Sequence, residues 1–285
     1  MNEEMHNLYD ALWGQKGSII TKLKVKVPQA KNGISPGYKM TIPQCVSGDL
    51  TESNFLSTPE EHSFKAIKLD SDLKAVLPCG VKKLLVRPEY EEIYDRVMKV
   101  EAGRWTRDGK RQRCWNEDES TRLDFLLSGQ PGTGITFLKL WLMNWLIVYL
   151  GKTYFLSYLL VRRLMKRKPT VYRTSDNMCF LFDEKSHGDE ITLHALARLD
   201  RHRMRKLWIL TDERITDPVW NMPTASWFIV LAASPKKVEA SNDWKKKRTP
   251  EVYFMSPWKW AEMFAAYRYV FSIYSFKLII KSLRK

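Results

Sequence analysis

A glycine-rich stretch between an apolar run and an amphipathic segment constrains the fold of this chain more than any other feature. The apolar run Leu123–Leu127 is followed by Gly129-Gln130-Pro131-Gly132-Thr133-Gly134. Glycines let a loop approach a phosphate group closely, so that its backbone N–H groups bind the phosphate oxygens. The pattern G-x-x-x-x-G-K-[ST] next requires a lysine, but Ile135 stands there. The sequence therefore predicts a phosphate-binding loop whose last part is displaced.

The missing end of the loop occurs further along the chain. Gly151-Lys152-Thr153 supplies the lysine and the hydroxyl residue, and Tyr154–Lys166 continues with apolar residues at helical spacing. Removing the 17 residues Ile135–Gly151 gives the continuous sequence GQPGTGKTYFLSYLLVRRL. We interpret the segment ITFLKLWLMNWLIVYLG as an insert and a candidate retained intron. As a helix it would be about 26 Å long and would carry Lys152 far from the loop.

Acidic residues follow a second apolar run and suggest a magnesium site. Leu207–Leu210 leads into Thr211-Asp212-Glu213, where Asp212 would hold Mg²⁺ and Glu213 would orient or deprotonate a water molecule. Asp183 and Glu184, which follow Cys179–Phe182, compete for this role. We prefer the later pair because the next apolar run, Trp227–Ala232, leads directly to Ser234. This serine is a candidate sensor of the terminal phosphate.

Continuous apolar runs separated by helical segments predict the fold class. Strands without polar alternation are typical of a parallel sheet covered on both faces. We therefore expect an α/β fold with a mainly parallel sheet flanked by helices. The strand candidates are Leu123–Leu127, Val171–Tyr172, Cys179–Phe182, Leu207–Leu210 and Trp227–Ala232. The helix candidates are Pro88–Met98, Tyr154–Lys166, Leu193–Arg205 and Trp258–Phe271.

The order of these segments suggests four regions. Residues 1–80 form a variable, partly ordered region, 81–120 an entry helix and polar loop, 121–270 the core with its insert 135–151, and 271–285 a basic and apolar tail. Within the first region, Ile19–Val27 and Tyr38–Ile42 resemble short strands. Thr58-Pro59-Glu60-Glu61 resembles the start of a helix.

Composition narrows the partners and the compartment. The 285 residues are 44% hydrophobic and carry a formal charge of +15, which favours a packed core and anionic partners such as nucleotide, nucleic acid or an acidic membrane surface. The four cysteines have no zinc-site spacing, and the acidic, polar N-terminus lacks the character of a secretory signal, so we expect an intracellular protein. Basic clusters at Arg162–Lys168, Arg201–Lys206 and Lys245–Arg248 are either solvated helix ends or a nucleic-acid or protein interface, with Trp244 and Trp258 available for base stacking.

The combined motifs resemble those of a known family. GQPGTG, GKTYFLSYLLVRRL, LWILTDE and SWFIVLAASP resemble segments of the fungal P-loop NTPases of the Crinkler / retrotransposon-hot-spot (RHS) type, and LLVRPEY resembles their entry segment. The resemblance covers residues 81–270 and implies an additional-strand P-loop ATPase domain that binds ATP and Mg²⁺. It assigns phosphate and Mg²⁺ binding to Gly129, Gly132, Gly134, Lys152 and Thr153, and hydrolysis to Asp212 and Glu213. The insert departs from the family pattern, so we expect weak or absent ATP hydrolysis.

Two other classes of function stay open at the level of sequence. One is a catalytically silent module that binds nucleic acid or protein. The other is a membrane protein anchored through residues 135–161, followed by the basic run Arg162–Lys168. Lys139 and Lys152 interrupt that apolar run, so we disfavour the anchor.

Overall fold

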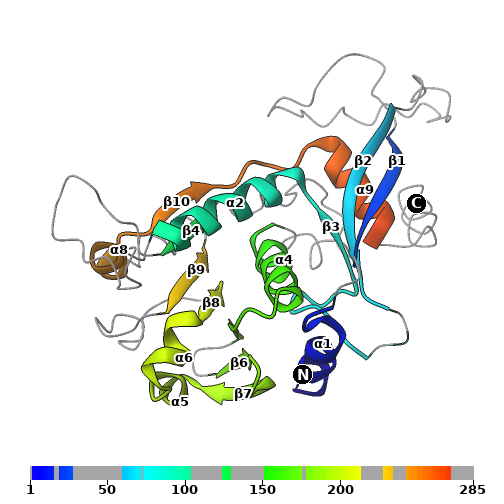
Figure 1. The fold of residues 1–285 in the computed structure, drawn as a ribbon. Coiled ribbons are helices and arrows are strands. Elements are labelled where there is room, and N and C mark those ends of the chain that lie inside the picture. Colours follow the sequence, from blue (N-terminus) through cyan, green and yellow to red (C-terminus); the bar gives the residue numbers. More distant parts are fainter. Residues whose placement is uncertain are drawn as a thin grey trace, which may run out of the picture.

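Two β-sheets and the helices around them make up the described part of the chain (Figure 1). The computed structural model describes residues 2–15, 19–27, 60–70, 72, 74–103, 124–129, 151–174, 178–212, 227–233 and 242–270. The larger sheet has seven strands in the order β10-β4-β9-β8-β5-β6-β7, and the smaller has three in the order β1-β2-β3. The large-sheet strands are β4 (Phe125–Ser128), β5 (Thr170–Arg173), β6 (Met178–Phe182), β7 (His187–Thr192), β8 (Trp208–Thr211), β9 (Phe228–Ala232) and β10 (Glu251–Phe254).

Five neighbouring strands of the large sheet are parallel. β10, β4, β9, β8 and β5 all run in the same direction, whereas β6 is antiparallel to β5 and β7 is antiparallel to β6. The expectation of an α/β fold with a mainly parallel sheet is thus confirmed. The run Cys179–Phe182 forms a strand as expected, but it runs against its neighbour because only a short connection separates it from β5.

Helices cover both faces of the large sheet, as expected from its uninterrupted apolar strands. On one face lie α4 (Lys152–Met165) and α2 (Pro88–Gly103); on the other, α5 (Leu193–Ala197) and the buried Trp244 of α8 (Asn242–Arg248) pack. The alternation along β4 shows the two layers, because Phe125 and Leu127 belong to the first core and Leu126 belongs to the second.

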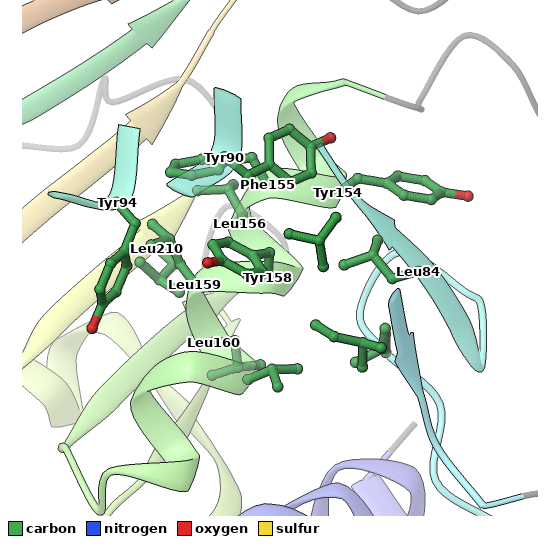
Figure 2. Close-up of a cluster of buried hydrophobic side chains, with 14 of the residues drawn as sticks. Leu84, Tyr90, Tyr94, Tyr154, Phe155, Leu156, Tyr158, Leu159, Leu160 and Leu210 are labelled. Carbon is green, nitrogen blue, oxygen red and sulfur yellow. The ribbon is translucent and has the colours of Figure 1, made fainter. Parts of the chain in front are cut away.

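The helix α4 is the centre of the first core. It contacts β5, β8 and β9 of the large sheet and β3 (Lys83–Val86) of the small one. Figure 2 shows Tyr154, Phe155 and Tyr158 of this helix among Tyr90 and Tyr94 of α2 and Leu84 of β3. All residues from Tyr154 to Val161 are buried, so α4 is enclosed on all sides and not only on one stripe.

The N-terminal residues contain more regular structure than the sequence indicated. The helix α1 (Asn2–Leu12) packs on β7, and β1 (Ile20–Val27) pairs antiparallel with β2 (Glu60–Lys68), which pairs with β3. The strand-like Ile19–Val27 is confirmed, whereas Tyr38–Ile42 lies outside the described residues. The helix start expected at Thr58–Glu61 is wrong, because Glu60 and Glu61 begin β2, where strand pairing outweighs the local capping signal.

The expected helix Leu193–Arg205 is two short helices. α5 ends at Ala197, and α6 (Arg201–Lys206) starts afresh after Asp200, whose side chain accepts a hydrogen bond from the N–H of Arg203 at 2.8 Å. Thr192 caps α5 in the same way. These side chains satisfy N–H groups that the first turn leaves unpaired, so each one starts a new helix. The C-terminal helix prediction is confirmed by α9 (Trp260–Val270).

Within the described residues, no helix combines the length and the apolar character needed to cross a membrane. The second part of the candidate anchor, residues 152–161, lies in α4 and is enclosed by the rest of the protein. Its first part, residues 135–150, lies outside the described residues.

Candidate phosphate-binding site at the carboxyl edge of the sheet

The structure places Lys152, at the start of α4, next to Gly129, the first residue of the predicted loop. β4 ends at Ser128, the buried Gly129 follows, and α4 begins at Lys152. The Nζ atom of Lys152 donates a hydrogen bond to the carbonyl oxygen of Gly129 at 3.2 Å. The expectation that the insert carries Lys152 far from the loop is therefore wrong. Packing on every side of α4 fixes where the helix starts, whatever the length of chain that leads to it.

A hydroxyl and a carboxylate meet next to this lysine. The Oγ1 atom of Thr153, in the first turn of α4, donates to the Oδ2 atom of Asp212 at 2.9 Å. Asp212 directly follows β8, and β9 lies between β8 and β4. Because these strands are parallel, their carboxyl ends lie at one edge of the sheet, where polar groups from separate strands can converge. Threonine hydroxyl and aspartate carboxylate oxygens are hard ligands, so this pair fits a Mg²⁺ ion.

Lys152, Thr153 and Asp212 are half-buried, which leaves them accessible to a ligand. Lys152 and Thr153 come from the start of α4, whereas Asp212 follows β8. Thr153 and Asp212 are 59 residues apart in sequence. A lysine, a hydroxyl and a carboxylate at a helix N-terminus can bind a phosphate group and the cation that accompanies it.

Tyr90 of α2 is a further residue at this edge, and the sequence did not single it out as functional. Its hydroxyl donates to the carbonyl oxygen of Gly151 at 3.0 Å, and this oxygen also accepts from the N–H of Phe155 at 3.1 Å. Burial raises the pKa of Tyr90 well above its ordinary value, so the hydroxyl stays protonated and remains a donor. Tyr90 therefore positions the residue before Lys152. In the sequence it is hidden in an apolar helical stripe.

The competing acidic residue Asp183 lies at the opposite edge of the sheet. Because β6 is antiparallel to β5, its carboxyl end lies beside the amino end of β5, where Phe182 pairs with Thr170. The Oδ2 atom of Asp183 is 2.6 Å from the Nε atom of Arg203, and its Oδ1 atom accepts from the N–H groups of Lys185 and Ser186. Burial alone would raise the pKa of Asp183, but these hydrogen bonds hold it below the ordinary value. This aspartate caps the β6–β7 turn and is remote from Lys152.

The other sequence-predicted site residues lie outside the described residues. They are Gln130, Pro131, Gly132, Thr133, Gly134, Glu213 and Ser234. The strand that leads to Ser234 does reach the site edge, because the N–H of Ala233 donates to the carbonyl oxygen of Leu127 at 2.9 Å.

The two tryptophans expected to stack on nucleic-acid bases are not available for it. Trp244 is 1% exposed and Trp258 is 8% exposed, so both belong to the protein interior. Trp258 packs against Arg87, whose guanidinium carbon lies 4.8 Å from the centre of its ring. The expectation of base stacking by these residues is wrong, because their large apolar surfaces are used to build the core.

Each basic cluster contributes at least one arginine to the structure itself. Arg163 is buried over the ring of Trp208 at 3.9 Å, Arg203 pairs with Asp183, and Arg248 pairs with Asp124. Burial lowers the pKa of Arg163 to about 9, an effect that the charge of Glu101 opposes. The clusters are thus neither wholly solvated helix ends nor wholly free to bind an anionic partner.

No family model matches the chain, and no curated protein or solved structure shows a significant match to it. The site is therefore defined by its own residues and geometry.

Proposed function

We propose that this protein is a P-loop NTPase of the additional-strand type that binds ATP together with Mg²⁺. The observation that carries the proposal is the 2.9 Å hydrogen bond from Thr153 to Asp212. Next to it, the Nζ atom of Lys152 lies 3.2 Å from the carbonyl oxygen of Gly129. A Mg²⁺ ion bound by both groups requires the Thr153 hydroxyl and the Asp212 carboxylate to lie this close together. The strand order supports the same class, because one strand, β9, separates the loop strand β4 from the acidic strand β8. On the resemblance of its motifs, we propose that the protein belongs to the Crinkler / RHS type of P-loop NTPase.

The proposed roles follow from the chemistry of each group. The N–H groups of the loop Gly129–Gly134 and of the first turn of α4 bind phosphate oxygens, and the Lys152 ammonium compensates their charge. Thr153 and Asp212 hold Mg²⁺, which neutralises negative charge on the phosphates. Glu213 orients the attacking water, and Ser234 contacts the terminal phosphate. Tyr90 positions Gly151 and with it the start of α4.

The insert affects hydrolysis more than binding in this proposal. The contact between Lys152 and Gly129 retains the lysine at the site, so phosphate binding survives. Residues 135–151 nevertheless separate Gly134 from Lys152, so the loop no longer leads directly into the helix N-terminus as in an uninterrupted motif. Hydrolysis depends on exact placement of the terminal phosphate and is therefore weak in the chain as written.

The test is a binding titration with a fluorescent ATP analogue, with and without Mg²⁺. Lys152→Ala should weaken binding at least about tenfold, because a charge-assisted contact to phosphate is worth roughly 1.5–3 kcal/mol. Lys168→Ala is the matched control, since it removes an exposed lysine beyond the other end of α4 and should leave the affinity unchanged. Equal affinities for the wild type and Lys152→Ala would refute the proposal.

A second variant addresses the insert. Deleting residues 135–151 restores the uninterrupted motif and should raise the ATPase rate well above that of the chain as written. Lys152→Ala in the deleted background should abolish the gain. If the deletion leaves the ATPase rate unchanged, the insert is not the cause of weak hydrolysis.

A further inference from the structure

The strand order shows which strands flank the candidate metal-binding pair along the carboxyl edge of the sheet. Thr153 and Asp212, which would hold the metal and with it the terminal phosphates, lie on the β8 side of β4. Under the proposed function, a nucleotide that extends along this edge away from β8 has its nucleoside end on the opposite side of β4. The neighbour of β4 on that side is β10, which is the edge strand of the sheet.

An exposed aromatic side chain stands at the carboxyl end of β10. Phe254 is 69% exposed and pairs in register with Ser128, one residue before Gly129. Val252, two residues earlier on the same face of the strand, is 41% exposed. Among the described residues these two are the exposed large hydrophobic side chains. Its register with Ser128 places the Phe254 side chain on the sheet face of Leu126, opposite to α4, at the carboxyl edge where the candidate phosphate loop begins. An aromatic ring left in solvent at this edge can serve as a ligand contact.

The backbone that carries Phe254 is held in place before any ligand arrives. The N–H of Met255 donates to the carbonyl oxygen of Ser128 at 2.8 Å, and the N–H of Ser256 donates to Glu89 at 2.7 Å. The buried guanidinium of Arg87 donates to the carbonyl oxygen of Ser256 at 3.2 Å. A ring on a fixed backbone loses little freedom on binding, which favours its use as a stacking surface.

We propose that Phe254 is the stacking platform for the base of the bound nucleotide. The inference rests on the proposed function, because the phosphate site sets the position and direction of the ligand. Aromatic stacking is tolerant of base identity, since every base offers a π-face. Phe254 therefore adds affinity for nucleotides over inorganic phosphates and does not itself choose adenine over guanine.

The test compares ATP with inorganic tripolyphosphate, both with Mg²⁺, on the full chain by isothermal titration calorimetry. Tripolyphosphate has the phosphates of ATP and no base. Phe254→Ala should weaken ATP binding roughly 5- to 150-fold and leave tripolyphosphate binding unchanged. Phe254→Trp should keep ATP affinity, and Val252→Ala is the matched control for loss of an exposed apolar side chain on the same strand.

The outcomes separate the inference from the proposed function. If the wild type binds neither ligand, the proposed function fails and the inference fails with it. If the wild type binds both ligands and Phe254→Ala leaves ATP affinity unchanged, only the inference fails. A variant that weakens both ligands equally would overturn the inference as well, because the ring would then act through the fold. A change in oligomeric state on sedimentation, at constant ATP affinity, would assign Phe254 to a contact between copies instead.

Discussion

The two ends of β4 use polar side chains for opposite purposes. At its amino end, Asp124 is fully buried and accepts hydrogen bonds from the N–H of Ile229 and from the guanidinium of Arg248, which also donates to the carbonyl oxygen of Trp227 at 2.8 Å. At its carboxyl end, the half-buried Lys152 contacts the carbonyl oxygen of Gly129. One end joins three segments of the protein, and the other holds half-buried polar groups where we propose that a nucleotide binds.

Burial explains the difference. A buried charge is costly unless it is paired and hydrogen-bonded, so the Asp124–Arg248 pair is stable only as a unit. The half-buried groups at the carboxyl edge keep part of their hydration and can exchange it for a ligand. An ion pair inside the sheet is therefore evidence about folding, whereas a partly accessible hydroxyl–carboxylate pair at the end of parallel strands is evidence about binding.

The largest expected effect comes from breaking the pair at the amino end. Asp124→Ala leaves the buried guanidinium of Arg248 without its carboxylate and should lower the free energy of unfolding by about 3–5 kcal/mol. Urea denaturation followed by circular dichroism measures it. Glu92→Ala is the matched control, because it breaks an exposed pair with Arg96 and should cost less than about 1 kcal/mol. A loss below about 1 kcal/mol in Asp124→Ala would contradict the structural role.

A smaller effect on stability but a selective effect on binding is expected at the carboxyl end. Thr153→Val removes the hydroxyl that donates to Asp212 and should reduce the Mg²⁺-dependent part of ATP affinity by about tenfold, or about 1.4 kcal/mol. Thr153→Ser retains the hydroxyl and should keep the metal dependence. Titrations of ATP at several Mg²⁺ concentrations give the comparison. If Thr153→Val and Thr153→Ser respond to Mg²⁺ alike, the hydroxyl does not hold the ion.

The smallest expected effect is a pH dependence of stability that arises from Asp183, at the edge of the sheet opposite to the candidate site. The pKa of Asp183 in the folded protein lies below the ordinary value of 3.8, so its ion pair with Arg203 contributes its full stability above that value. This contribution is lost as the pH falls below 3.8 toward the pKa of the folded state. Asp183→Asn should therefore show a flatter decline of stability with acid than the wild type. Parallel declines in thermal melts between pH 5 and pH 2 would exclude this role.

The sequence predicted the five inner strands of the large sheet because they are continuous apolar runs. It missed the two edge strands, β7 and β10, because they contain exposed positions and are not continuous apolar runs. It did not reveal the direction of β6, since an apolar run carries no direction. The signal lay in the spacing: Thr174–Asn177 and Asp183–Ser186 are each four residues long, whereas a parallel crossover needs a dozen or more.

The site was predicted in part for a similar reason. The motifs that contain Thr153 and Asp212 predicted which residues form the site. The structure adds that their side chains are joined by a hydrogen bond. The position of Lys152 could not be predicted from the insert length, because it depends on contacts that α4 makes far from the loop. Tyr90 was missed because its hydroxyl contact with Gly151 joins segments 61 residues apart.

Because packing holds α4 in place, the position of Lys152 does not depend on the length of the connection that precedes it. Between Gly129 and Lys152 the chain has 22 residues as written and would have 5 without the insert. The general dependence of loop closure on length makes the longer connection less favourable by only about 1.3 kcal/mol. A mutation that changes the length of this connection can thus alter the proposed phosphate-binding loop while the surrounding architecture stays the same.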